Sequence, residues 1–236
     1  GQTFAGEDAE LPVTARASIG RLRGVTGSSS VRTLEDTFVQ RNDRIDERET
    51  GGISVAAADT NLPATLGATI RAGAFLNAAT ARYPGVVLGA VAARRLGIAE
   101  PGVNVWLAKR WFTVVGVLEP VVLDPGLDTA ALIGYDVAAS LLRTDRSPTT
   151  IYVRTDPERV EEVRAALAAS ANPEHPEEPQ VSRPSDALAA RAAAKGAFTA
   201  LFLGLGAVAL LVGGVGIANV MVISVLERRS EIGLRR

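Results

Sequence analysis

The sequence predicts an α+β domain with two subdomains, followed by one long transmembrane α-helix. Three features carry this prediction. Short β-branched runs bounded by glycine alternate with helical patterns through residues 1–183. One stretch has the pattern of a hairpin, and the 31 residues 196–226 contain no charge.

The elements of the first part are short and mixed. A helix ends near Gly24, and Asp156 with Pro157 is typical of the start of another. Strands are predicted at 29–39, 51–59, 86–88, 103–107, 111–118, 130–134 and 149–155, and helices at 90–96, 135–143 and 156–170.

The hairpin is the clearest of these patterns. Val103, Val105 and Leu107 alternate with polar or bulky neighbours, residues 108–110 make the turn, and 111–118 return.

We expect the middle of the domain, about 65–145, to be an insertion between flanks that fold together. Residues 10–60 and 146–182 form these flanks. The strand at 149–155 needs a partner, and the strand at 29–39 is available.

The uncharged run 196–226 is long enough for a membrane span. A bilayer core needs about 20 apolar residues, and 31 residues rise about 46 Å as a helix. A buried core helix is the alternative, but a water-soluble helix of this length would carry a polar face. The run lies at the wrong end of the chain for a signal peptide.

Small residues in the run favour packing against other membrane helices. Glycines spaced by four let helices approach closely, and Asn219 can donate a hydrogen bond across such an interface. The alternative is that lipid merely tolerates the glycines. The candidate packing residues are Gly204, Gly206, Gly213, Gly214, Gly216 and Asn219.

A helical stem is predicted at 184–195, directly before the span. Ser182 or Ser185 can cap this helix. A continuous helix from about 185 to 229 would transmit motion along its length. The alternative is that Gly196 acts as a swivel, which would make the helix a passive tether. Arginines crowd the C-terminal side of the span, so the positive-inside rule places that end in the cytoplasm and residues 1–183 outside.

The sequence contains no pattern of a catalytic, metal or cofactor site. The single histidine, His175, stands in a proline-rich loop, where a solvated side chain is expected. No P-loop occurs, and the G-x-G-x-x-A match at 204–209 lies inside the apolar run without a preceding strand. The acidic pairs Glu161/Glu162 and Glu177/Glu178 are expected on the surface.

The composition argues against nucleic-acid-binding proteins and against proteins with disulfides or thiolate metal sites. The net charge of -1 gives no field that would attract nucleic acid, and the absence of cysteine excludes disulfides and thiolate metal sites. The chain begins at Gly1 and its only methionine is Met221, so we expect it to be a fragment.

The last ten residues change from apolar to charged. Glu227 and Glu231 share a helix face and repel one another, whereas Glu231 and Arg235 attract. A partner with basic groups would explain the acids; an ordinary stop-transfer end is the alternative.

The sequence of 210–236, "LLVGGVGIANVMVISVLERRSEIGLRR", resembles the MacB/FtsX-like family of ABC-transporter permeases. In that family a membrane helix with a GGxGIxN patch leads into E-R-x-x-E-I-G-x-R. The stretches 86–98 and 110–119 are similar in pattern to the family's extracytoplasmic core domain. The matching tail residues are Glu227, Arg228, Glu231, Ile232, Gly233 and Arg235.

The resemblance implies a division of the chain and a set of partners. Residues 1–183 would be a MacB-like extracytoplasmic core domain, 196–226 the second of four membrane helices, and 227–236 the start of a cytoplasmic coupling segment. That segment would dock on a separate ABC ATP-binding subunit, which would hydrolyse ATP. Further permease helices or a second permease protomer, and the lipid bilayer, complete the expected surroundings.

Two other functions remain open from the sequence. A membrane-anchored extracytoplasmic binding or signalling module would need neither an ATPase nor further helices. An ectoenzyme would need site chemistry, which the sequence lacks. An adjacent ATPase gene and two further downstream spans would favour the permease.

Overall fold

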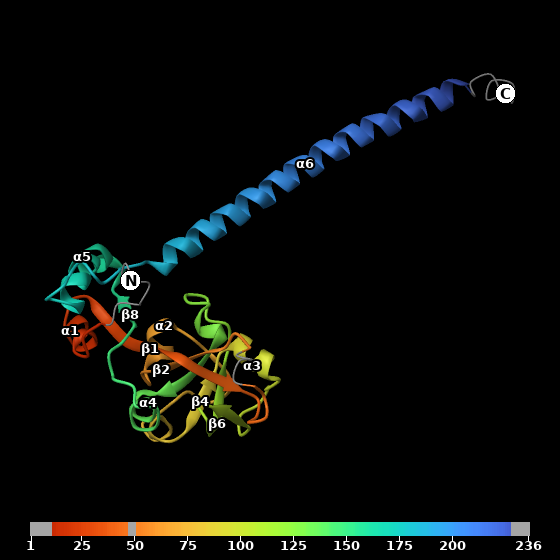
Figure 1. The fold of residues 1–236 in the computed structure, drawn as a ribbon. Helices are drawn as coiled ribbons and strands as arrows, with labels where there is room; N and C mark the ends of the chain where they lie inside the picture. Colours follow the sequence, from red (N-terminus) through yellow and green to blue (C-terminus); the bar gives the residue numbers. More distant parts are fainter. Residues whose placement is uncertain (1–10, 47–50, 228–236) are drawn as a thin grey trace. The chain divides into compact units, whose positions relative to one another are not determined.

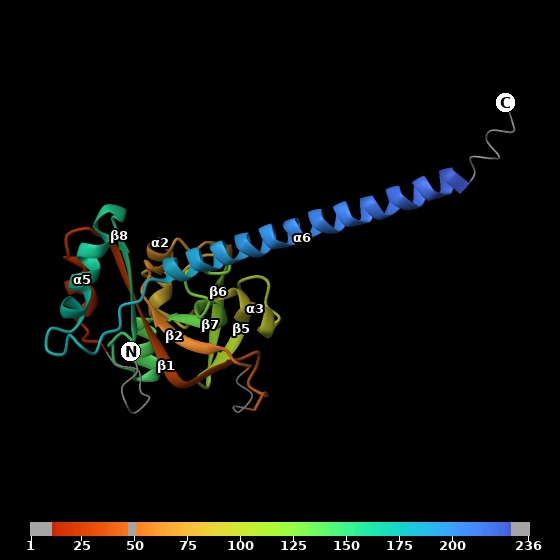
Figure 2. The same ribbon diagram turned by 90° about the horizontal axis from the view of Figure 1, so that it is seen from above.

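The computed structural model describes residues 11–46 and 51–227, and the chain divides into two units. The first comprises residues 1–182 and the second residues 183–236. The first is an α+β domain and the second is a helix, as the ribbons in Figures 1 and 2 show.

One mixed eight-stranded sheet organises the first unit. Its order is β2-β7-β4-β6-β5-β1-β8, with β3 paired to β6, and β1 also pairs with β2. The pairings β2–β7 and β4–β6 are parallel, and the others are antiparallel. The strands are β1 (Val25–Gln40), β2 (Ser54–Ala58), β3 (Ile70–Gly73), β4 (Gly85–Leu88), β5 (Asn104–Leu107), β6 (Arg110–Leu118), β7 (Ala130–Gly134) and β8 (Thr150–Thr155).

Apolar side chains cover both faces of the sheet centre. Val86 and Leu88 of β4 belong to one buried cluster, with α3 and α4, whereas Val87 between them belongs to a second cluster. This explains why β4 and β7 are apolar at every position rather than alternating. The helices and 3₁₀ turns of the domain are α1 (Ala15–Gly20), α2 (Leu62–Leu66), η1 (Thr80–Arg82), α3 (Ala90–Leu96), η2 (Leu127–Thr129), α4 (Tyr135–Leu142), η3 (Pro157–Arg159) and α5 (Val160–Ala171).

The strand pairing expected between the two flanks is confirmed. Residues 25–31 of β1 pair antiparallel with β8. A third buried cluster joins α1 and α5 through Ile19 and Ala171, with Val25 and Val153 packed against it. Every member of this cluster lies outside residues 65–145. The exact limits of an inserted subdomain stay a prediction, since β2 pairs with both β1 and β7.

Most predicted elements match the structure within a few residues. The helix 90–96 and the hairpin are where the sequence places them. The first helix ends at Gly20, not near Gly24, and Asp156 caps a 3₁₀ turn before α5 begins. Two short elements were not predicted: α2 and β3 have only five and four residues.

The second unit is one uninterrupted helix, α6 (Pro184–Glu227), of 44 residues. It begins where the proline predicts and runs through all six glycines of the apolar run without a break. The stem and the span are therefore parts of a single helix.

Candidate functional site

The C-terminal helix is the first functional element. Ala194–Leu226, a stretch of 33 residues, is long and apolar enough to cross a membrane. At 1.5 Å per residue it measures about 50 Å, more than the hydrocarbon core of a bilayer. Its large side chains are exposed on every side in the chain alone; Leu210 is 78% exposed and Leu211 68%. Lipid or other helices would cover such a surface.

The expected packing surface has open space around it within this chain. A Cβ atom added at any of the six glycines of the run would meet no atom within 4 Å, and Asn219 is exposed. Helix packing through Gly204, Gly206, Gly213, Gly214, Gly216 and Asn219 therefore stays a prediction.

The coupling segment falls at the end of the described chain. Glu227 is the last residue of α6, and its side chain is not described. Arg228, Glu231, Ile232, Gly233 and Arg235 lie outside the described residues. Their role stays a prediction.

His175 and residues 204–209 are the positions where a metal-binding or nucleotide-binding motif was considered in the sequence and not expected. The side chain of His175 is 59% exposed, with Nδ1 3.4 Å from Oε1 of Glu177. Within residues 11–46 and 51–227, no three His, Asp or Glu side chains gather as metal ligands would. Residues 204–209 lie inside α6, so their G-x-G-x-x-A match does not follow a strand.

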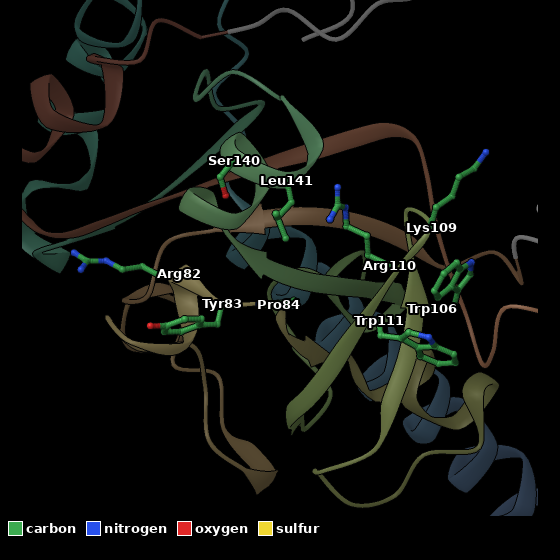
Figure 3. Close-up of a pocket in the computed structure, with 9 residues that line it drawn as sticks. All are labelled: Arg82, Tyr83, Pro84, Trp106, Lys109, Arg110, Trp111, Ser140 and Leu141. Atoms are coloured by element: carbon green, nitrogen blue, oxygen red, sulfur yellow. The ribbon is translucent and has the colours of Figure 1, made fainter.

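The structure also contains a pocket that the sequence analysis missed. It is open to solvent, has a volume of about 600 Å³, and lies where β4 and β6 begin, beside α4 (Figure 3). We call it the hairpin pocket, because the β5–β6 hairpin supplies four of its lining residues. The lining is Arg82, Tyr83, Pro84, Trp106, Lys109, Arg110, Trp111, Ser140 and Leu141.

Parallel pairing assembles this pocket from distant segments. Gly85 at the start of β4 pairs with Thr113 of β6, which brings Tyr83 and Pro84 to the hairpin. Two tryptophans flanking two cations at a turn were visible in the sequence. The sequence did not show that residues 82–84 lie beside these residues, because that depends on the pairing of β4 with β6.

The tryptophans form a cross-strand pair on the hairpin. Trp106 pairs directly with Trp111, and their ring centroids are 5.1 Å apart with planes at 65°. Aromatic pairs favour such an edge-to-face arrangement. The contact fixes Trp106 but leaves Trp111 46% exposed.

Positively charged side chains contribute to the lining of the hairpin pocket. Three of the nine lining residues are Arg or Lys, and none is Asp or Glu. Arg82 lies 3.7 Å from Asp136, which also binds Arg146 at 2.5 Å. The guanidinium group of Arg110 has no hydrogen bond or ion pair with residues 11–46 and 51–227, and only its backbone pairs, with Leu107 of β5.

The turn of the hairpin is strained. Ala108 and Lys109 have φ angles of 46° and 62°, the left-handed region that glycine and asparagine usually occupy in two-residue hairpins. Each non-glycine residue there costs roughly 1 kcal/mol. Strain of this kind often accompanies a functional position.

Comparison with known proteins identifies the family. The sequence profile of the MacB-like periplasmic core domain matches residues 1–170. The macrolide export ATP-binding/permease protein MacB of Rhodospirillum rubrum is 28% identical over 98% of this chain and 36% of its own length. The pyoverdine export ATP-binding/permease protein PvdT of Pseudomonas aeruginosa is 32% identical over 52% of the chain and 20% of its own length. The chain thus spans about a third or less of these relatives.

Solved structures support the same fold. The extracellular domain of the ABC-type transporter YknZ from Gram-positive bacteria superposes with a TM-score of 0.55, at 13% identity, over 73% of this chain and 88% of that domain. The periplasmic region of MacB from Actinobacillus actinomycetemcomitans gives a TM-score of 0.54, at 14% identity, over 72% of this chain and 80% of that region.

The domain is therefore extracytoplasmic, and the apolar helix that follows it anchors it in a membrane. Sequence, fold and topology agree with the resemblance that the tail motif first indicated, and the chain belongs to the MacB/FtsX-like family of ABC-transporter permeases.

Proposed function

We propose that this chain is part of the permease subunit of a MacB/FtsX-type ABC transporter. It couples ATP hydrolysis by a partner subunit in the cytoplasm to motion of the extracytoplasmic domain, for export or mechanotransmission. The observation that carries this proposal is the continuity of α6 from Pro184 to Glu227.

A continuous helix suits mechanical coupling. The 44 residues of α6 measure about 66 Å, roughly twice the hydrocarbon thickness. A rod of this kind transmits tilt and translation between its ends, whereas a flexible linker would absorb them. One end of α6 continues from the domain and the other leads into the expected coupling segment.

The tail supplies the cytoplasmic contact in this proposal. Arg228, Arg229, Arg235 and Arg236 follow the span and favour a cytoplasmic C-terminal end. Glu227 and Glu231 are four residues apart in the sequence, and we infer that they offer two acids to basic groups of the ATP-binding subunit. Residues 1–236 contain no P-loop, so in this proposal these residues do not hold the nucleotide.

A change in helix stiffness tests the proposal. In the full-length permease with its ATPase, a short Gly-Ser stretch is inserted between Lys195 and Gly196. The matched control is an alanine insert of about seven residues, which adds two turns and keeps the helix face and the rod.

Motion is measured directly with a spin label. Residues 1–236 contain no cysteine, so Glu162→Cys on the exposed face of α5 supplies a single labelling position per protomer once any cysteine elsewhere in the full-length permease is replaced by serine. We expect ATP to shift the label-to-label distance between the two protomers in the native and alanine-insert proteins. In the Gly-Ser protein hydrolysis should persist while the shift disappears.

Two results would contradict the proposal. An unchanged ATP-dependent shift with the Gly-Ser insert would show that the rod is unnecessary. Failure of any ATP-binding subunit to co-purify with the native full-length protein would favour the anchored binding or signalling module instead.

A further inference from the structure

The hairpin pocket combines two kinds of group that the coupling function does not use. Tyr83 is 69% exposed and Trp111 46%, although each could bury a large apolar surface. Aromatic side chains and arginine are the residues that most often dominate the energetics of protein interfaces. Here both kinds line one surface (Figure 3).

The charges select an acidic ligand. Lys109 and Arg110 lie on the hairpin with the tryptophans, and Arg82 lies next to Tyr83 (Figure 3). No carboxylate lines the pocket, although Asp136 lies 3.7 Å from Arg82. The guanidinium groups can bind carboxylates through two parallel hydrogen bonds. A cationic ligand would be repelled by these three groups, and a neutral polar ligand would gain weaker hydrogen bonds from them than a carboxylate would.

The shape favours a segment of a macromolecule over a small molecule. Small-ligand sites usually enclose most of the ligand surface, whereas this pocket of about 600 Å³ is open to solvent. Its lining also extends from η1 across the hairpin to α4, as an extended peptide would require.

The pocket is well placed within the domain for such a contact. Figure 2 shows β5 and β6 on the side of the domain away from α5. The tryptophan pair and the pairing of β5 with both β1 and β6 hold the hairpin in the sheet. A site held in this way loses less conformational entropy on binding than a free loop would.

We propose that the hairpin pocket binds an extended acidic segment of a partner protein, one that alternates carboxylates with apolar side chains. The carboxylates pair with Arg110 and Arg82, and the apolar side chains cover Trp111 and Tyr83. This contact lies outside the membrane and does not depend on coupling to an ATPase.

The test uses the full chain in nanodiscs of uncharged phosphatidylcholine. The probe is a short fluorescent peptide that alternates glutamate with leucine, and the control probe replaces each glutamate with lysine. Fluorescence anisotropy reports binding. We expect only the acidic peptide to bind, with affinity that decreases as salt is raised.

Two variants locate the binding. Arg110→Glu and Trp111→Ala should each lower the affinity for the acidic peptide by about tenfold or more. Arg94→Glu on α3 makes the same change of charge at an exposed position outside the pocket, and Val122→Ala removes an exposed apolar group elsewhere. Both controls should bind as the native chain does.

Three outcomes would overturn the proposal. The first is equal binding of the acidic peptide by the native chain and Arg110→Glu, or no binding at all. The second is displacement of the acidic peptide by heparin from the native chain and from Trp111→Ala alike, which would indicate a site that binds polyanions by charge alone. The third is concentration-dependent self-association that Arg110→Glu abolishes, which would assign the pocket to a second copy of the chain. Native-like circular dichroism of each variant excludes misfolding as the cause.

Discussion

The hydroxyl of Tyr152 donates a hydrogen bond to a carboxylate oxygen of Asp124. Tyr152 lies on β8, in the flank of the domain, whereas Asp124 lies between β6 and β7, in the middle segment. The other carboxylate oxygen of Asp124 accepts from the backbone N–H of Gly126 at 2.8 Å. One side chain thus connects β8 to the middle of the chain and shapes the loop before η2.

Removing this hydroxyl should destabilise the domain. Tyr152→Phe leaves a partly buried carboxylate oxygen without its donor, which costs about 1.5 kcal/mol for a bond to a charged group. Thermal unfolding of the full chain, followed by circular dichroism, should show a lower Tm. Tyr83→Phe is the control, because Tyr83 is 69% exposed and its hydroxyl has no hydrogen bond to the described residues. Equal Tm values for the two variants would contradict the prediction.

Stability should fall at alkaline pH. Burial raises the pKa of Tyr135 to about 12, and burial together with the neighbouring Asp124 raises the pKa of Tyr152. Tyrosines of the unfolded chain ionise near pH 10. The neutral forms stabilise the fold fully below about pH 10, and this contribution is lost as the pH rises from about 10 through the raised pKa of the folded state.

Chemical unfolding at a series of pH values measures this effect. The free energy of unfolding of the native chain should decrease between about pH 10 and 12. The double variant Tyr135→Phe/Tyr152→Phe should have lower stability at neutral pH and a shallower decrease. A decrease of the same steepness in the double variant would assign the effect to other groups.

The glycine that ends β7, directly before α4, should tolerate no side chain. A Cβ atom at Gly134 would lie 2.2 Å from the carbonyl oxygen of Ala81. The backbone would have to move, so Gly134→Ala should cost about 3 kcal/mol. At Gly27 on β1 the nearest atom would be 3.7 Å away, and Gly27→Ala should change stability by only about 0.5 kcal/mol. Similar unfolding midpoints for the two variants would refute this close approach.

The sequence predicted the local elements well and their assembly less well. The hairpin turn, α3 and α6 follow from short-range patterns: alternation, a glycine after Leu96, and an apolar run. The parallel pairing of β2 with β7 joins segments more than 70 residues apart, and no local pattern encodes it. The hairpin pocket was missed for this reason, since residues 82–84 reach it only through β4.

The tail should be essential for contact with the ATP-binding subunit. Glu231→Arg in the full-length complex reverses one charge of the acid pair and should weaken co-purification of the ATPase or uncouple hydrolysis. Glu162→Arg makes the same change on exposed α5 and should have neither effect. Unchanged co-purification together with unchanged transport in Glu231→Arg would refute a role for this acid.

The glycine-rich face of α6 should pack against other membrane helices. Gly214→Leu adds a large side chain to the row Gly206/Leu210/Gly214/Ala218, where close approach of helices depends on small residues. Val212→Leu enlarges a side chain about 200° away around the helix and serves as the control. In this chain alone the space around Gly214 is open, and Val212 is 64% exposed. A loss of assembly in Gly214→Leu, measured by native electrophoresis of the full-length permease, therefore reports contacts with another helix. If both variants assemble as the native protein does, the glycines are merely tolerated in lipid.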